Sequence, residues 1–121
     1  MKDYIAQACR TESVTFNAHG TERLLHAGIG MATEAGEFLD ALKKSVFYGK
    51  ELDRTNLKEE LGDLLWYIAI AMDALETDFD TEMRRNIAKL RARYGEAFSE
   101  TAAEQRDLDA EREILEDNHE K

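Results

Sequence analysis

Apolar residues recur at three- and four-residue steps over two long stretches of this chain, from about residue 21 to 47 and from about 55 to 75. That spacing places them along one face of an α-helix. The positions expected to be buried are Leu24, Leu25, Gly28, Met31, Ala32, Ala35, Leu39, Leu42 and Val46 in the first stretch, and Leu57, Leu61, Leu64, Leu65, Ile68, Ala71, Met72 and Leu75 in the second. The pattern therefore predicts two long amphipathic helices.

Residues that favour helix ends bracket both stretches. Thr21 is expected to cap the start of the first helix, and Gly49 can take the left-handed conformation that ends it. Asp53 or Thr55 is expected to cap the second helix. These residues predict where the first helix ends and where the second begins.

The rest of the chain is also helical in pattern. We predict a short helix at Asp3–Arg10, an irregular stretch at Asn17–Gly20, a third helix at Thr81–Tyr94 ended by Gly95, and a helical tail over about Asp107–Glu116. No stretch alternates with the period of a β-strand, and the absence of proline suits uninterrupted helices. The fold class is therefore expected to be all-α.

A chain of 121 residues has room for one domain. We expect its core at about residues 21–95 and an acidic helical extension at 96–121. The two long helices are apolar on more than one side, because Phe38, Trp66 and Ile70 supplement the main stripes. This predicts a four-helix core completed by self-association, as a homodimer or a homotetramer.

Charge and composition exclude several classes of partner. The formal net charge is −10, which argues against nucleic acid as the main partner. No apolar run approaches the length of about 18 residues that a membrane span needs. The single cysteine, Cys9, has no partner for an internal disulfide, so a reducing cytoplasm is the expected location.

Two acidic pairs interrupt the apolar helices: Glu34-Ala-Gly-Glu37 and Glu60-Leu-Gly-Asp63. Residues three apart share a helix face, so antiparallel packing would bring all four carboxylates together. Two such charges about 5 Å apart repel by about 3 kcal/mol at an effective dielectric constant of about 20, so a cation is expected between them. The all-oxygen ligand set favours Mg²⁺, with Mn²⁺ as a substitute. Each pair also encloses a glycine, which often marks the close approach of a helix or ligand.

The stretches Thr33–Lys44 and Lys58–Tyr67 resemble the MazG-like nucleoside triphosphate pyrophosphohydrolases of the all-α NTP pyrophosphatase superfamily, and Asn86–Gly95 resembles their third helix. The resemblance implies a helical bundle that hydrolyses a (deoxy)nucleoside triphosphate to the monophosphate and pyrophosphate, by water attack at the α-phosphate. It also implies that the four carboxylates hold magnesium. Glu37, with Glu34, would orient or deprotonate the attacking water.

The same resemblance suggests Tyr67, one turn beyond Asp63, as a nucleotide contact. Asn86, Lys89 and Arg93 lie on one face of the predicted third helix and are candidates for binding the triphosphate, from the same or a neighbouring subunit. The alternative is a solvated basic face that balances local acids.

Three further residues are weaker candidates for contacts with the substrate or the metal. Lys43 and Lys44 are better explained as solvated surface than as phosphate contacts, and His26 as a histidine in or beside the core. Two alternative functions stay open. One is a narrow-specificity dUTP or dCTP pyrophosphatase, and the other is a non-catalytic helical oligomer that binds divalent metal.

Overall fold

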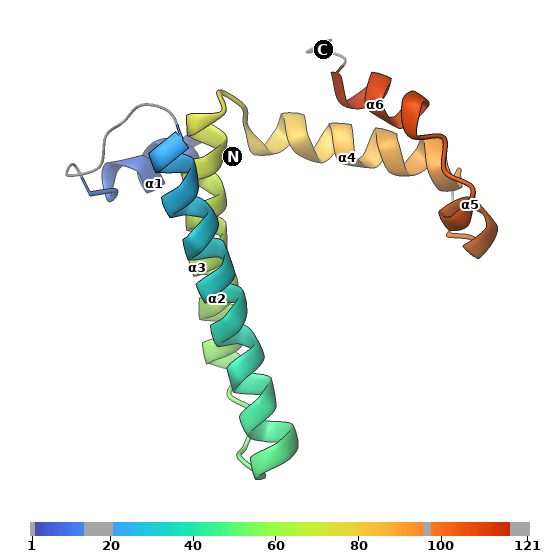
Figure 1. Ribbon diagram of the computed structural model, residues 1–121. Coiled ribbons are helices and arrows are strands. Elements are labelled where there is room, and N and C mark those ends of the chain that lie inside the picture. Colours follow the sequence, from blue (N-terminus) through green and yellow to red (C-terminus); the bar gives the residue numbers. More distant parts are fainter. Residues whose placement is uncertain (1, 14–20, 96–97, 117–121) are drawn as a thin grey trace. The chain divides into compact units, whose positions relative to one another are not determined.

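The computed structural model describes residues 2–13, 21–95 and 98–116 (Figure 1). This part of the chain contains six helices and no strand, which confirms the all-α fold class. The helices are α1 (Lys2–Arg10), α2 (Thr21–Tyr48), α3 (Arg54–Ala74), α4 (Phe79–Tyr94), α5 (Glu100–Glu104) and α6 (Leu108–Glu116). They fall into two compact units, residues 1–78 and 79–121, which are described separately below.

In the first unit, α2 and α3 run side by side in opposite directions, and α1 packs against α3 (Figure 1). Gly49 ends α2 with a φ of +66°, and the Lys50 amide then donates a hydrogen bond to the carbonyl of Lys44. Asp53 caps α3 by accepting a hydrogen bond of 3.0 Å from the Asn56 amide, so Asp53 rather than Thr55 is the cap. The antiparallel packing that the convergence of the acidic motifs requires is therefore present in the first unit.

Small residues form the contact between these helices. A Cβ atom added to Gly30 would lie 2.1 Å from the Tyr67 ring, so only glycine allows the ring to pack there. The fully or almost fully buried apolar residues of the unit are Ala8, Ala27, Ala69 and Ile70. The core is thus narrow and depends on close approach of the helix backbones.

The predicted buried stripes are wrong in part. The exposed members are Leu25, Gly28, Ala32, Ala35, Leu39, Val46, Leu61, Leu65 and Leu75. Each long helix carries apolar residues on more than one side, and packing in this unit covers only one of those sides. The prediction of self-association stays open, and the exposed leucines are the surface that it would cover.

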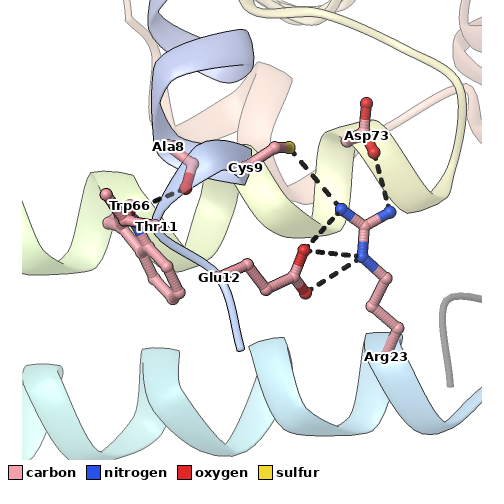
Figure 2. Close-up of polar contacts among 7 residues, drawn as sticks. All are labelled: Ala8, Cys9, Thr11, Glu12, Arg23, Trp66 and Asp73. Carbon is pink, nitrogen blue, oxygen red and sulfur yellow. Dashed lines mark hydrogen bonds and ion pairs between the residues drawn. The ribbon is translucent and has the colours of Figure 1, made fainter. Parts of the chain in front are cut away.

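A buried arginine links α1 to the α2–α3 pair, a feature that the sequence pattern did not reveal (Figure 2). The Arg23 guanidinium bonds both oxygens of Glu12, at 2.8 Å from Nη2 and 3.0 Å from Nε, and Asp73 at 2.7 Å. It also lies 3.5 Å from the sulfur of Cys9. Hydrogen bonding to Glu12 is the main reason that the pKa of Arg23 is raised, so this buried charge is fully compensated.

A second contact holds the end of α1 in place. The Trp66 indole Nε1 donates a hydrogen bond of 2.8 Å to the Thr11 hydroxyl. Residues 14–20, which include the predicted irregular stretch Asn17–Gly20, lie outside the described part of the chain. Helix α2 begins at Thr21, which is therefore its first residue and not, as predicted, the cap that precedes it.

The second unit contains α4, α5 and α6. Helix α4 begins two residues before the predicted Thr81 and ends at Gly95, whose φ is +69°. Helix α5 was not predicted; it is only five residues long and Ser99 caps it. Helix α6 matches the predicted helical tail and packs against α4. Within the described residues, no helix of either unit has the length and apolar character to cross a membrane.

Candidate functional site

The antiparallel α2–α3 pair brings the two acidic motifs together. Glu34 and Glu37 of α2 and Glu60 of α3 each offer an oxygen, and these oxygens lie within 4.8 Å of one another. A second group of the same size joins Glu60 to Glu59 and Asp63. Asp63 therefore belongs to the cluster through Glu60. Glu59 was not among the predicted ligands, although it precedes Asp63 by one helical turn.

Glu60 is the centre of both groups. It is only 4% exposed, and its Oε2 has no hydrogen-bond partner among the described residues. Hydrogen bonding with Glu34, burial, and the charges of Glu37 and Asp63 raise the pKa of Glu60 to about 7. A buried carboxylate among other carboxylates is unfavourable unless a cation compensates it.

The chemistry of this donor set fits a hard divalent cation. Only carboxylate oxygens are offered, with neither thiolate nor imidazole in either group. The unpartnered Glu60 oxygen is the atom that such an ion would satisfy. The cluster thus has the composition of a divalent metal site.

The glycines inside the two acidic motifs do not mark close approach within this chain. A Cβ added at Gly36 or Gly62 would meet nothing within 4 Å. The close approach occurs at Gly30 instead, one turn before Glu34. Approach of another helix of this chain is therefore not the reason for the two motif glycines, and approach of a ligand stays a prediction.

A cavity of about 690 Å³ opens beside the carboxylates, at the end of the hairpin where α2 turns into α3. Its volume lies within the range of small-molecule sites. It is lined by Thr33, Gly36, Glu37, Asp40, Ala41, Lys44, Lys50, Glu51, Asp53, Asn56 and Glu60. The carboxylate cluster therefore faces a space that is large enough for several phosphate groups.

Tyr67 lies on the other side of the cluster, one turn beyond Asp63. Its ring is half-buried and makes edge contacts with His26 and Trp66, at centroid distances of 5.8 and 5.0 Å. His26 thus belongs to an aromatic group beside the core, in line with its interpretation from the sequence. The role of Tyr67 as a nucleotide contact stays a prediction.

The other predicted substrate contacts belong to the second unit. On α4, Asn86 is exposed and Lys89 is half-buried. Arg93 bonds Glu111 of α6 at 2.7 Å, and Arg106 bonds the same carboxylate at 2.6 Å. The two arginines, Arg93 foremost, lower the pKa of Glu111 to about 2. Arg93 thus has a carboxylate partner in its own unit, which the sequence did not indicate.

Comparison with known proteins identifies the family of this chain. Residues 24–98 match the MazG nucleotide pyrophosphohydrolase domain. The chain belongs to the MazG family. The gene 37 protein of Mycobacterium phage L5 is 34% identical over 77 residues, which cover 60% of this chain and 67% of the phage protein. No solved structure matches the chain. The MazG match includes both acidic motifs and α4, and so confirms the predicted family.

Proposed function

We propose that this MazG protein hydrolyses (deoxy)nucleoside triphosphates to the monophosphate and pyrophosphate, with Mg²⁺ as its metal and Mn²⁺ as a substitute. Membership of a nucleotide pyrophosphohydrolase family supports the reaction class. The observation that carries the proposal is the convergence of carboxylates from two helices on the buried, unpartnered oxygen of Glu60.

Glu34, Glu37, Glu60 and Asp63 would hold the metal. A divalent ion supplies positive charge to the phosphoryl oxygens and makes water a better nucleophile. Glu60 is the anchor of the site, because it belongs to both carboxylate groups and is the most deeply buried. Glu34 is half-buried and hydrogen-bonded to Glu60, so it holds that side chain in position.

Glu37 is the best candidate for the general base. It is exposed and lines the cavity, so its carboxylate can accept a proton from water that attacks the α-phosphate. A positioned base typically contributes about 10²–10⁴-fold to the rate.

Contacts to the rest of the substrate complete the proposal. Tyr67 would contact the nucleoside, and Asn86, Lys89 and Arg93 the triphosphate, in the same or a partner subunit. Since Arg93 is already bound to Glu111, Asn86 and Lys89 are the more available of the three. The exposed apolar side chains of α2 and α3 support a homodimer or homotetramer.

A product assay tests the proposal. The purified protein is incubated with each common (d)NTP and with dUTP in Mg²⁺, and the products are separated by anion exchange. We expect monophosphate and pyrophosphate from the native protein and almost none from Glu37→Gln. Glu22→Gln, an exposed change on the same helix, serves as the control and should retain activity.

Two results would contradict the proposal. Diphosphate and phosphate as products would mean that a different bond is cleaved. No turnover of any nucleotide by a folded protein that binds metal would favour the non-catalytic oligomer. The rank order of substrates would separate a broad enzyme from a dUTP or dCTP pyrophosphatase.

A further inference from the structure

We propose that the cavity beside the carboxylates receives the two phosphates that leave as pyrophosphate, with Lys44 and Lys50 as their cationic contacts. The inference rests on the function proposed above. It adds the direction in which a triphosphate lies along the α2–α3 pair.

The backbone at the end of α2 brings these two lysines to one wall of the cavity. Gly49 reverses the chain with its positive φ, and the Lys50 amide then donates a hydrogen bond of 3.1 Å to the carbonyl of Lys44. Both side chains line the cavity, although six positions separate them in the sequence. Ammonium groups are strong partners for phosphate oxygens.

The remaining lining suits phosphate rather than a nucleobase. Asn56, in the first turn of α3, adds an amide donor, and none of the described residues that line the cavity is aromatic. Bases are usually bound by flat apolar or aromatic surfaces. In this unit the aromatic group of His26, Trp66 and Tyr67 provides such a surface.

The carboxylates separate these two surfaces along α2. Lys44 follows Glu37 by seven residues, and His26 precedes Glu34 by eight, so each lies about 10–12 Å from the cluster along the helix axis. A nucleotide with its α-phosphate at the carboxylates would therefore direct its outer phosphates toward the hairpin turn. Its nucleoside would point toward Tyr67.

Electrostatics adds a condition. Five carboxylates line the cavity, against the ammonium groups of Lys44 and Lys50. Free pyrophosphate would be repelled by this excess of negative charge, so it should bind only after divalent ions occupy the acidic cluster. Lys44 now pairs with Asp40 at 2.8 Å, but both side chains are exposed. Exposed ion pairs contribute little to the free energy of folding, so Lys44 can leave Asp40 and contact a phosphate instead.

Lys43 provides a matched control. It bonds the same Asp40 at 3.0 Å and is equally exposed. It does not line the polar cavity but a separate, mainly apolar groove, beside Leu39, Val46 and Phe47. Replacing Lys43 removes the same charge from the same helix without touching the proposed subsite.

The test is calorimetric titration of inorganic pyrophosphate into the full-length protein, with and without Mg²⁺. We expect binding that requires Mg²⁺ and that weakens about tenfold in Lys44→Met and in Lys50→Met, the loss of one charge-assisted contact. Lys43→Met should change the affinity by less than about twofold. Far-UV circular dichroism verifies that each variant is folded.

The outcomes separate this inference from the proposed function. Pyrophosphate that does not bind, or that binds Lys44→Met and Lys50→Met as tightly as the native protein, would overturn the subsite even if triphosphates are hydrolysed. Lysine-dependent binding of pyrophosphate supports the subsite. If no triphosphate is hydrolysed in that case, the proposed reaction alone is wrong.

Discussion

Each of the two units buries one glutamate to the same degree, yet the surroundings of the two residues are opposite. Glu60 and Glu111 are both 4% exposed. Glu60 lies among other carboxylates and has an unpartnered oxygen, whereas Glu111 is bonded to Arg93 and Arg106. Among the described residues, no lysine or arginine forms a salt bridge with Glu60, whereas the charge of Glu111 is already neutralised. Burial alone therefore does not identify a functional acid; the charge around it does.

The pKa values express the same difference. Neighbouring acids raise the pKa of Glu60 to about 7, and the arginines lower that of Glu111 to about 2. A site built to receive a cation is unfavourable by itself, while an ion pair that joins two helices is complete. We infer that Glu60 serves the reaction and that Glu111 serves the fold.

The largest expected effect is a loss of metal binding on replacing Glu60. Glu60→Gln removes the ligand shared by both carboxylate groups, so metal affinity and hydrolysis should each fall by about a hundredfold or more. Glu111→Gln should leave metal affinity within about twofold of the native value. Titration calorimetry with Mn²⁺ and the product assay measure both quantities. Equal losses in the two variants would remove the distinction between the two glutamates.

The second prediction concerns pH. Because the pKa of Glu60 is raised from an ordinary value of 4.5, its contribution to the stability of the first unit is fully present below pH 4.5 and is lost as the pH rises through 7. The pKa of Glu111 is lowered, so its contribution is present above pH 4.5 and is lost as the pH falls toward 2.

Amide hydrogen exchange, corrected for the intrinsic pH dependence, can follow each unit separately. In metal-free protein, protection of α2 and α3 should decrease between pH 4.5 and 7, and added Mg²⁺ should restore it. Protection of α4 and α6 should decrease only in acid. Glu60→Gln and Glu111→Gln should each flatten the response of their own unit, and a response that survives its variant would mean that another group causes it.

The third prediction tests the close packing of α2 against the Tyr67 ring of α3. Gly30→Ala would force the Tyr67 ring away from α2 and should lower the free energy of unfolding by about 1–3 kcal/mol. Gly28→Ala, on the exposed side of the same helix, meets no neighbour within 4 Å and should instead raise stability by up to about 1 kcal/mol. Denaturant unfolding measures both values. A stable Gly30→Ala protein would show that the ring can move freely.

Parts of the fold and of the candidate site could be predicted from the sequence, and other parts could not. Local signals sufficed for the long helices and their ends, since Gly49, Asp53 and Gly95 act on their own neighbours. Helical spacing predicted that the two acidic motifs would meet if the helices packed antiparallel, and they do. The choice between apolar faces did not, because both helices are apolar on several sides and the pattern does not say which side packs.

Contacts between distant residues were also missed. Arg23 bonds Asp73, 50 positions away, and Arg93 bonds Glu111, 18 positions away. Each is one charged residue among many, and nothing local distinguishes it from a solvated surface residue.

The smallest expected effect is at Arg112, the residue next to Glu111. Arg112 pairs with Glu116 one turn away on α6, and both side chains are well exposed. Such a pair contributes at most about 0.5 kcal/mol, so Arg112→Met should barely change the free energy of unfolding, and less still at high salt. Arg93→Met removes the same charge but leaves the buried Glu111 with Arg106 as its remaining partner in that ion-pair group, so it should destabilise the second unit clearly. Equal effects of the two variants would mean that the Glu111 ion pairs are no stronger than a surface pair, and the contrast with Glu60 would then rest on the first unit alone.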